Sequence, residues 1–528
     1  MKKFTFRSLL PLAIAGVLFS ACKDENDDGN TSKTTYEFSV KAEDNPISAP
    51  ANGKTYTILV TSTKTAQAGT SAVAYEVVSS PEWAPAELEQ TALVITVAKN
   101  SSTAAREPGK VVLKQDESDK TLEITVNQAG FSNSMSLDAT YSTDRCKVLV
   151  IEPTITGFDQ NPVYKWTVKG PDDAEATKAG TDKTLSFIQL ETGDYIVSLT
   201  VTDDSGITET KSATVTVATE ATAYSPYISE VLEYNPAVFD TRIAQSGISP
   251  TDTKTAALQK VSDKIVNKDF AEMTQVGAHL GTLGGYIVFR FDHTVMNVPG
   301  YCDFRIGSGI GASARPTPGI VYVAFDKNGN GKPDDDEWYE LAGSEYGKTS
   351  TRTNVKIVYN RPTSFPTSYP GSDVENYVSW TINDKETEGV NLSMMMFMWN
   401  GVPQWPYWLR EGDEGATLTF TNLVQLPSNI TVSNGTPSSA TFYQYGYACN
   451  SNPKNEAKSS FDIDWAVDKE GNKVNLPGVD FVKVQTGSLQ LVGNYGVSGT
   501  IINSAIDLHL KEGQTPISSE AAMNGENK

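Results

Sequence analysis

The sequence predicts an all-β protein in which two small β-sandwiches precede a larger β-sandwich with long loops. Short runs that alternate apolar and polar residues recur along the whole chain and are separated by turn-rich segments, as in antiparallel sheets. Residues 92–97 and 121–126 are clear examples. The 528 residues exceed what one hydrophobic core holds, and usual domain sizes suggest about three units. Only residues 251–270 have the period of an amphipathic helix.

The charge balance argues against a nucleic-acid partner. The chain contains 64 acidic and 43 basic residues, which gives a formal net charge of −21. Such a surface repels the phosphate backbone of DNA and RNA, and no stretch rich in Lys and Arg interrupts it. We therefore expect no nucleic-acid binding.

Residues 1–21 are typical of a secretory signal peptide. Basic residues precede an apolar run at 9–18, which is too short to span a bilayer. The segment ends in Leu18-Phe-Ser-Ala-Cys22, which resembles the lipobox of bacterial lipoproteins, where the signal is cleaved before a lipidated cysteine. The resemblance implies a lipid on Cys22; an ordinary signal peptide with an incidental cysteine is the alternative. No later apolar run is long enough to span, so we expect the lipid to be the only membrane anchor.

Residues 22–35 form an acidic, polar tether. Its start, Lys23-Asp-Glu-Asn-Asp-Asp28, resembles the export signal that sends Bacteroidetes lipoproteins to the outer face of the outer membrane. The resemblance implies a protein that is lipid-anchored in the outer membrane and exposed at the cell surface.

Residues 36–130 are expected to form the first Ig-like β-sandwich. Trp83 follows a turn, the strand-like run Ile95-Thr-Val-Ala-Lys-Asn100 comes next, and the segment closes with Val126-Asn-Gln-Ala-Gly130. In order and spacing these features resemble the BACON domain of Bacteroidetes surface proteins. That resemblance implies either a carbohydrate-binding module or a spacer. Because Trp83 is the segment's only tryptophan, a core position is favoured over a sugar platform.

Residues 131–218 are expected to form the second Ig-like β-sandwich. Val163-Tyr-Lys-Trp-Thr-Val168 resembles the tryptophan strand of Ig-like folds, and the run GDYIVSLTVTDDSG at 193–206 resembles the strand and hairpin of the PKD family. The family motif that should follow the tryptophan is missing after Trp166, so the resemblance supports a PKD-like domain only.

Residues 224–512 are expected to form the large domain, a jelly-roll-like β-sandwich with long loops, followed by a flexible tail at 513–528. Six of the eight tryptophans lie in this domain, so we expect any ring-lined ligand surface there. Segments 227–236, 283–292 and 461–468 resemble a family of Bacteroidetes cell surface proteins. That resemblance implies a lipoprotein that works near TonB-dependent importers, some for cobalamin and others for glycans.

The acidic segment 326–337 matches the pattern of a calcium-binding loop. Oxygen-bearing side chains at alternate positions, a central glycine and a final glutamate let such a loop surround a hard cation with about six to eight oxygens. The expected ligands are Asp326, Asn328, Asn330, Lys332 through its carbonyl, Asp334 and Glu337. Because the flanking runs look like strands, we interpret the site as a structural calcium clip rather than a calcium sensor. A solvated acidic turn is the alternative.

The segment 399–408, WNGVPQWPYW, is the expected ligand surface. Its prolines and glycine exclude regular structure, which places the aromatic rings on a loop. Exposed rings would stack on sugar C–H faces or on a flat macrocycle. The rings are those of Trp399, Trp405, Tyr407 and Trp408. The alternative is that they fill the core, which the preceding run MMMFM also fits.

The remaining cysteines, histidines and acids form no recognisable catalytic or metal motif. Cys146, Cys302 and Cys449 are far apart in sequence, and buried thiols are favoured over a bridge between Cys302 and Cys449. His293 follows a strand and an aspartate, which fits a structural histidine better than a catalytic one. The acids that could pair for glycoside hydrolysis are Asp462, Asp464, Asp468 and Asp480.

We therefore expect a non-enzymatic surface lipoprotein whose small sandwiches act as a stalk. Its large domain would capture a glycan or a cobalamin-type molecule for a TonB-dependent importer. A calcium ion would hold the loops of that domain and lower the ordering cost of binding. Two alternatives stay open: a surface glycoside hydrolase with its acids in the large domain, or an adhesion protein.

Overall fold

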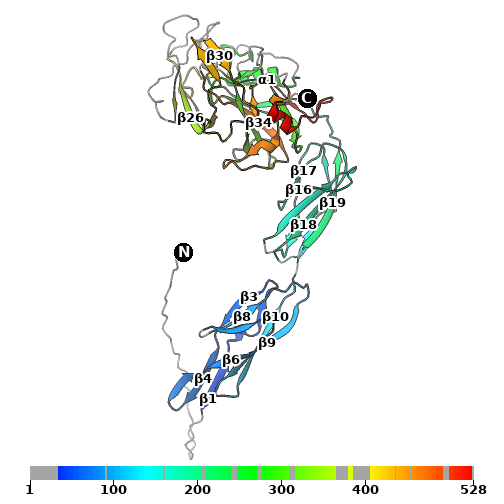
Figure 1. Cartoon of the computed structure of the whole chain (residues 1–528), viewed down its shortest axis with the longest axis vertical. Coiled ribbons are helices and arrows are strands. Elements are labelled where there is room, and N and C mark those ends of the chain that lie inside the picture. Colours follow the sequence, from blue (N-terminus) through cyan, green and yellow to red (C-terminus); the bar gives the residue numbers. More distant parts are fainter. Residues whose placement is uncertain are drawn as a thin grey trace, which may run out of the picture. The chain divides into compact units, whose positions relative to one another are not determined.

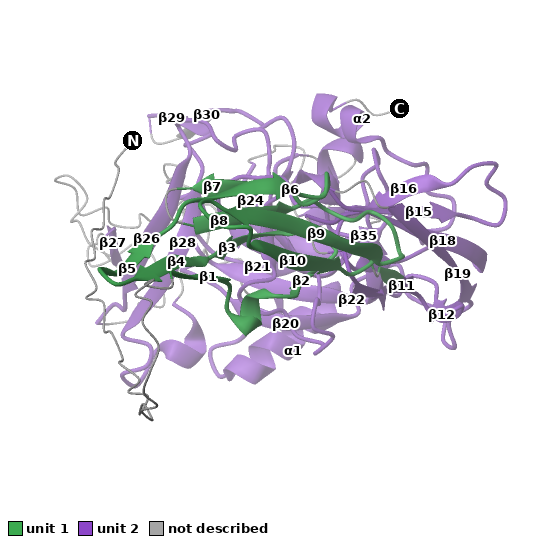
Figure 2. Ribbon diagram, turned by 90° about the horizontal axis from the view of Figure 1, so that it is seen from below, with its two compact units in different colours: residues 1–134 green, residues 135–528 purple. Residues whose placement is uncertain are grey.

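A computed structural model describes thirteen segments of the chain. They are residues 34–89, 92–131, 133–158, 161–204, 208–238, 246–269, 276–308, 316–363, 378–383, 405–434, 436–451, 455–490 and 499–525. Strands make up nearly all of their regular structure, which confirms the predicted all-β class. The chain divides into two compact units, Met1–Ser134 and Met135–Lys528 (Figure 2). Cys22 and Trp399 lie outside the described residues.

The first unit consists of β-strands around one core (Figure 1). The strands are β1 (Thr35–Ser39), β2 (Ile47–Ala49), β3 (Lys54–Ile58), β4 (Thr61–Ala66), β5 (Gly69–Ala72), β6 (Tyr75–Ser79), β7 (Ala86–Glu89), β8 (Ala92–Val97), β9 (Arg106–Gln115) and β10 (Thr121–Gln128). They form sheets in the orders β2-β10-β9-β6, β3-β8-β7 and β1-β4-β5. Trp83 is half-buried against this core and Arg106 lies over its ring at 5.1 Å, which favours the expected structural role over a sugar platform.

The second group of strands surrounds Trp166, which is fully buried. The strands are β11 (Ser134–Ser136), β12 (Thr140–Asp144), β13 (Leu149–Ile151), β14 (Thr154–Thr156), β15 (Val163–Lys169), β16 (Thr177–Gly180), β17 (Leu185–Phe187), β18 (Gly193–Thr202) and β19 (Thr208–Ala218). The main sheet has the order β12-β19-β18-β15-β16, and β13 pairs with β17. The indole N–H of Trp166 donates to the carbonyl of Asp182 at 2.9 Å, so the buried ring leaves no unsatisfied polar group.

The large C-terminal part is a sandwich of a seven-stranded and a four-stranded sheet. The first contains β20 (Glu230–Asn235), β22 (Tyr286–Met296), β34 (Gly478–Thr486), β24 (Gly319–Ala324), β25 (Trp338–Leu341) and β33 (Ala466–Val467) in that order, with β31 (Tyr447–Ala448) beside β24. The second contains β21 (Ala278–His279), β35 (Ile501–Asp507), β23 (Phe304–Ser308) and β32 (Ser460–Phe461). Side chains of both sheets, such as Val484 and Ile502, meet in one continuous core. Each such buried aliphatic side chain contributes roughly 1.5–3 kcal/mol.

Smaller elements complete this part. They are β26 (Arg352–Asn360), β27 (Ser379–Ile382) and β28 (Thr417–Gln425), which form one sheet, and the hairpin of β29 (Ile430–Ser433) and β30 (Thr436–Ala440). Short 3-10 helices are η1 (Ala42–Asp44) in the first unit, η3 (Tyr407–Leu409), η4 (Ala457–Ser459) and η5 (Ile463–Trp465). Helix α1 (Lys254–Ile265) confirms the predicted helix; Thr253 caps it, accepting a hydrogen bond from the N–H of Ala256 at 3.2 Å.

The C-terminal segment corrects the prediction of a flexible tail at 513–528. It contains helix α2 (Ser519–Asn524), which Ser518 caps and which ends at Gly525 in a left-handed conformation. Ala522 is fully buried in the main core. The backbone N–H of Cys302 donates to Ile517, so this segment is part of the folded domain.

Two further findings concern the described residues. Cys146, Cys302 and Cys449 are buried free thiols, as favoured over a disulfide. No helix in the described part of the chain is both long and apolar enough to cross a membrane.

Candidate functional site

A row of five side chains crosses the outer face of the seven-stranded sheet. Strand pairing places Glu233 opposite Val288, Val288 opposite Lys483, Lys483 opposite Tyr322, and Tyr322 opposite Glu340. Directly paired residues point to the same face of a sheet, and the neighbours of these residues along each strand lie in the core between the two sheets. The five residues, here called the outer row, therefore face away from that core.

Lys483 lies against two tyrosine rings of this face. Its Nζ is 4.4 Å from the ring centre of Tyr286 and 5.6 Å from that of Tyr322. The Tyr286 hydroxyl donates to Glu233 at 2.9 Å. Burial lowers the pKa of Lys483, and the carboxylates of Glu233 and Asp335 partly offset this effect. Among the described residues, no hydrogen bond or ion pair to the ammonium group is seen.

Glu340 lies on the other side of Tyr322 and also lacks a hydrogen-bond partner among the described residues. It is half-buried between Tyr322 and Val467, its neighbours in the sheet. Burial raises the pKa of Glu340 to about 7. Burial also raises the pKa of Tyr322, and the charge of Glu340 adds to that increase. Near neutral pH this carboxyl group can both donate and accept a hydrogen bond.

A second, smaller core covers the neighbouring part of the outer face. Ile320 packs there with Leu426, Tyr443 and Tyr447, and Tyr322 contacts the edge of this cluster. The rings of Tyr443 and Tyr447 meet edge-on, with their centres 5.4 Å apart. The outer row thus lies beside this second core, and Tyr322 packs against it.

The acidic loop joins β24 to β25, the strands that carry Tyr322 and Glu340. The carboxylate of Asp326 accepts hydrogen bonds from the backbone N–H groups of Asn330 and Gly331 at 3.0 and 2.7 Å. Gly331 has a φ of +74°, which glycine adopts without strain. The glycine therefore stands where the predicted sharp turn requires it.

Four more side chains close the loop. Glu337 is buried, and its carboxylate accepts from the N–H groups of Lys327 at 2.9 Å and Asp334 at 3.1 Å. One carboxylate oxygen of Asp334 accepts from the side-chain amides of Asn328 and Asn330 at 2.6 and 2.8 Å. These contacts gather the predicted calcium ligands around one closed turn.

The polar side chains of the loop serve its own hydrogen bonds in this geometry. Within the described segments, no group of three or more His, Cys, Asp or Glu side chains is placed to hold a metal ion. The side-chain oxygens of Asn328 and Asn330 accept from the N–H groups of Asn330 and Lys332, so they face the backbone. Lys332 is exposed. The loop is closed by its own hydrogen bonds.

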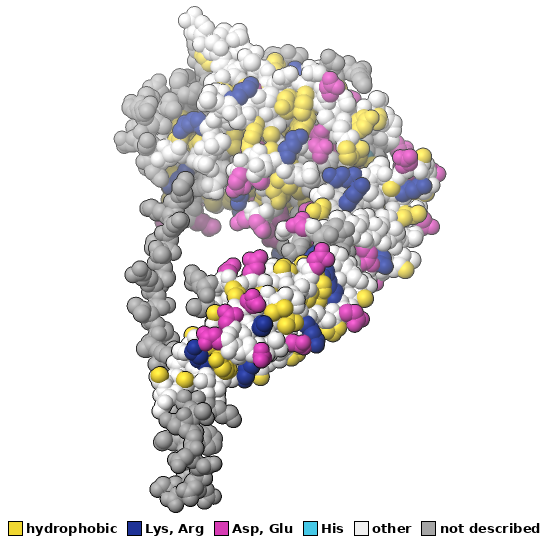
Figure 3. Space-filling view, turned by 60° about the horizontal axis from the view of Figure 1, so that its bottom comes forward, with side chains coloured by type: hydrophobic (Ala, Val, Ile, Leu, Met, Phe, Trp, Pro, Cys, Tyr) yellow, Lys and Arg dark blue, Asp and Glu magenta, His cyan; other side chains and the backbone are white. Residues whose placement is uncertain are grey.

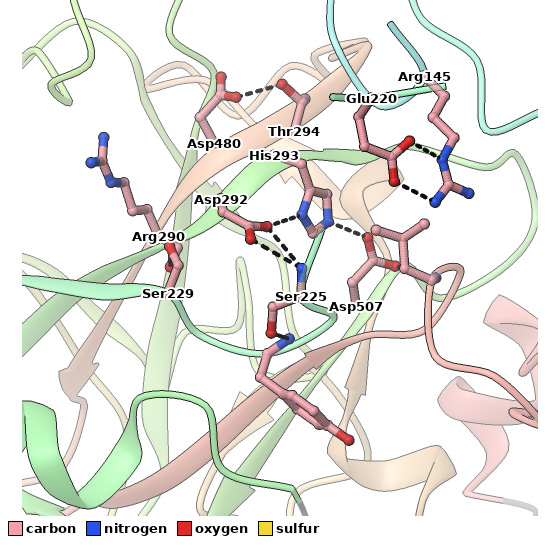
Figure 4. Close-up of polar contacts among 12 residues, drawn as sticks. Arg145, Glu220, Ser225, Ser229, Arg290, Asp292, His293, Thr294, Asp480 and Asp507 are labelled. Atoms are coloured by element: carbon pink, nitrogen blue, oxygen red, sulfur yellow. Dashed lines mark hydrogen bonds and ion pairs between the residues drawn. The ribbon is translucent and has the colours of Figure 1, made fainter. Parts of the chain in front are cut away.

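Asp480 fastens the acidic loop to the sheet. It lies on β34, accepts from the N–H of Asp326 at 2.7 Å and accepts from the hydroxyl of Thr294 at 2.6 Å, the latter contact being visible in Figure 4. Burial raises the pKa of Asp480 despite these bonds. Asp480 therefore links the acidic loop to strands β34 and β22.

His293 is held by two carboxylates. Its Nδ1 lies 2.8 Å from Asp292 and its Nε2 lies 2.8 Å from Asp507, so both ring nitrogens are engaged (Figure 4). Burial lowers the pKa of His293, but the hydrogen bonds to Asp292 and Asp507 raise it above its usual value. Because both ring nitrogens are bonded to carboxylates, His293 has the geometry of a structural residue. The sequence favoured this role over that of a catalytic base.

Trp405 corrects the prediction of an exposed aromatic loop. Its side chain is fully buried in a cluster that includes Leu283, Tyr359 and Trp380. The indole N–H donates to the carbonyl of Leu409 at 3.1 Å. The small sheet of β26, β27 and β28 supplies an apolar layer, so burying this ring removes a large apolar area from water without losing a hydrogen bond.

Tyr407 and Trp408 are half-buried and pack against the main core. Arg410 lies over the ring of Tyr407 at 4.4 Å, and the ring of Trp408 is 6.4 Å from that of Tyr234. The predicted platform therefore does not exist at Trp405, and only part of each remaining described ring faces water. The outer row offers a more coherent ligand surface, although the sequence analysis did not identify it.

The acids considered for hydrolysis accept hydrogen bonds from nearby groups. Asp462 is buried, caps η5 by accepting from the N–H of Asp464 at 2.7 Å, and accepts from the hydroxyl of Ser519. Asp468 accepts from the N–H of Asn472 at 2.7 Å. Asp462 thus follows β32 directly and is the N-cap of the 3-10 helix η5.

Charged side chains are mixed on the surface that Figure 3 draws. Lys and Arg side chains lie singly or in small groups among acidic and apolar ones. On that face there is no extended basic surface of the kind that follows a nucleic-acid backbone.

Comparisons with known proteins identify one part of the chain. Residues 152–217 match the profile of a PKD domain family, which confirms the PKD-like assignment of the second sandwich. No curated protein matches the chain.

The comparison with solved structures finds matches of low identity and low TM-score. The fibronectin(III)-like modules of CbhA from Clostridium thermocellum are 13% identical, cover 36% of this chain and 100% of their own, and have a TM-score of 0.15. Titin Ig tandem domains are 9% identical over 36% and 98%, with a TM-score of 0.16. Human protocadherin-24 is 12% identical over 36% and 100%, with a TM-score of 0.19.

Proposed function

We propose that this chain is a non-enzymatic lipoprotein of the outer-membrane surface that captures a ligand for a TonB-dependent importer. Cys22 would carry the lipid, and the BACON-like and PKD-like sandwiches would act as a stalk. The lipobox-like and export-signal-like segments support the location. The resemblance of the large domain to Bacteroidetes cell surface proteins supports the importer.

The outer row is the observation that carries the binding function. Sugars present apolar C–H faces together with closely spaced hydroxyl groups, which calls for aromatic rings beside hydrogen-bond donors and acceptors. Tyr286 and Tyr322 supply rings, Lys483 supplies donors, and Glu340 supplies both kinds of group. Lys483 and Glu340 lie two strand spacings apart, roughly 10 Å. That distance suits a ligand lying across Tyr322.

A glycan is favoured over a cobalamin-type ligand by the surrounding charge. Glu233 and Asp335 act electrostatically on Lys483, so this part of the face combines one cation with several carboxylates. A neutral polyol can hydrogen-bond to both signs of charge without desolvating a charge of its own. The cobalamin-type ligand is the second candidate, because a flat macrocycle could lie on the same tyrosine rings.

Binding is favoured over hydrolysis by the spacing of the acids in the row. Glu340 has a pKa suited to a general acid. Its fellow carboxylate in the row, Glu233, is four strand spacings away, roughly 19 Å. Glycosidases place their two carboxyl groups about 5–9.5 Å apart. The row thus has the composition of a sugar-binding surface and the spacing of a non-catalytic one.

We also propose that the acidic loop binds calcium. The side-chain amide nitrogens of Asn328 and Asn330 now point to the Asp334 carboxylate. Rotating each amide by half a turn would point its oxygen there instead. Those oxygens, with the carboxylates of Asp326 and Glu337 and the Lys332 carbonyl, have the chemistry that Ca²⁺ prefers. Bound calcium would neutralise the crowded acids of the loop. The connection between the strands of Tyr322 and Glu340 would be stiffened as a result.

The decisive experiment is binding of a glycan array and of cobalamins to the full chain. Tyr322→Ala and Lys483→Met should each weaken binding of the best ligand about tenfold or more, since each removes a ligand contact. Lys469→Met, at an exposed loop position, is the matched control. If no glycan or cobalamin binds, or if the control weakens binding as much as the row variants, the capture function is wrong.

The location is tested separately in cells. Cys22→Ser should release the protein from the outer-membrane fraction, and external protease should digest the wild-type protein in intact cells. A wild-type protein that stays protected from the protease would place it inside the envelope and remove the surface role.

A further inference from the structure

Strand β20 is an end strand of the seven-stranded sheet. Among the described residues it pairs on one side only, with β22. In an antiparallel sheet, alternate residues direct their backbone N–H and C=O groups to opposite sides. Part of the backbone of Glu230–Asn235 therefore points away from β22. Such an edge is a template for an added strand unless the fold covers it.

A groove lies along this edge, between β20 and helix α1. Its volume is about 460 Å³, within the range of about 300–1,000 Å³ that is typical of ligand sites. The helix contributes side chains of one face, three or four residues apart, and β20 and the residue before it form the other wall. The lining residues are Ser229, Glu230, Val231, Thr255, Leu258, Gln259, Ser262, Asp263 and Val266.

The groove combines an apolar floor with a polar rim. Val231 belongs to the main core, and Leu258 and Val266 are half-buried against it, so the floor is rigid and apolar. An edge strand that faces a helix across such a groove is the arrangement in which extended peptides bind as an extra strand. Backbone pairing supplies affinity in that mode, and the alternate side chains supply specificity.

The charges of the rim are acidic. Glu230 comes from β20 and Asp263 from α1, and none of the lining residues is Lys or Arg. Asp263 accepts from the Gln259 amide at 2.9 Å. Glu230 pairs with Arg290 at 2.6 Å, but its side chain keeps 49% of its surface exposed and can contact a second cation. The rim therefore complements a positively charged partner.

We propose that the groove between β20 and α1 binds an extended, basic peptide segment of a partner protein. The peptide adds to the edge of β20 as a further strand, places apolar side chains over Val231 and Leu258, and directs Lys or Arg toward Glu230 and Asp263. None of the residues that line the groove belongs to the outer row, and the proposal does not depend on glycan capture.

The test is a bead library of acetylated, amidated heptapeptides probed with the full chain. Enriched peptides should contain Lys or Arg at alternate positions. Asp263→Lys and Glu230→Gln, which change the rim but not the floor, should each weaken binding of the best peptide about fivefold or more. Lys469→Gln, on an exposed loop, is the control and should bind like the wild type.

Two measurements on the best peptide report the binding mode and do not depend on the variants folding. Methylation of alternate peptide nitrogens should abolish binding, because it removes the strand hydrogen bonds. The peptide should also slow hydrogen exchange of the β20 amides. The proposal is overturned if enrichment shows no preference for basic residues, if methylated peptides bind equally, or if protection appears elsewhere. It is equally overturned if the wild type and Asp263→Lys enrich the same peptides to the same extent.

Discussion

Glu340 gives a quantitative test of the outer row, because the cost of its burial follows from its pKa. Burial raises that pKa from 4.5 to about 7. Each pKa unit corresponds to about 1.4 kcal/mol of free energy. Ionising Glu340 in the folded protein therefore costs about 3 kcal/mol, and water at its exposed edge reduces this to about 2 kcal/mol.

The sign of the pH dependence follows from the bound proton. Between pH 4.5 and about 7 the folded protein holds the proton of Glu340 and the unfolded chain has lost it, so stability falls as the pH rises. Glu340→Gln removes this pH-dependent contribution to the free energy of unfolding. The variant should differ little from the wild type at pH 4.5. At pH 8 it should be about 2–3 kcal/mol more stable, which raises the Tm of the large domain by roughly 5–10 °C.

The assay is scanning calorimetry of the full chain at both pH values. Comparing variant with wild type cancels the contributions of the other buried acids, such as Asp303, whose pKa burial also raises to about 7. Glu470→Gln, at an exposed turn, is the matched control and should leave Tm unchanged at both pH values. An equal Tm difference for Glu340→Gln at pH 4.5 and pH 8 would refute the reasoning, because it would mean that this carboxyl titrates normally.

Three further predictions concern the fold and the loop. Trp405→Ala should destabilise the large domain by about 3–5 kcal/mol in urea unfolding, since it empties a fully buried site; a change below about 1 kcal/mol would contradict the core position. Gly285→Ala should largely prevent soluble expression, because the added Cβ would lie 1.8 Å from the carbonyl oxygen of Leu280; a stable variant would show that this backbone can move. Calcium should raise the Tm of the wild type, chelator should reverse the effect, and Asp326→Ala with Glu337→Ala should abolish it; a Tm insensitive to calcium in the wild type removes the metal proposal.

The strand pattern was largely readable because it is local. Alternation in 193–206 predicts a strand, and β18 covers Gly193–Thr202 with Tyr195, Val197, Leu199 and Val201 buried. The tryptophan of 163–168 lies on β15 and is the central buried side chain of its sandwich. When one face of a sheet is buried, every second residue of a strand is apolar, and this alternation is visible in the sequence.

The outer row was not readable because it depends on register between distant segments. Tyr322 meets Lys483 only through the pairing of β24 with β34, which are separated by more than a hundred residues. Alternation showed which residues share a face of one strand. It did not show that rings, an ammonium and a carboxyl from five strands would align.

Trp405 and the C-terminal segment show where tertiary packing overrides local signals. Pro406 keeps Trp405 out of regular structure, as the sequence indicated, yet an irregular backbone can still bury its side chain. Residues 519–524 are too few for a stable helix alone, but burial of Ala522 and the Ser518 cap make α2 form. Residues such as proline show where regular structure ends. They do not show which aromatic side chains are buried.

The most direct test of the account is a crystal structure of the full chain with the tightest-binding glycan from the array. The account predicts a sugar lying over Tyr322, with hydroxyl groups in hydrogen-bond contact with Lys483 and Glu340. A sugar bound instead against Tyr407 and Trp408, with the outer row empty, would contradict it.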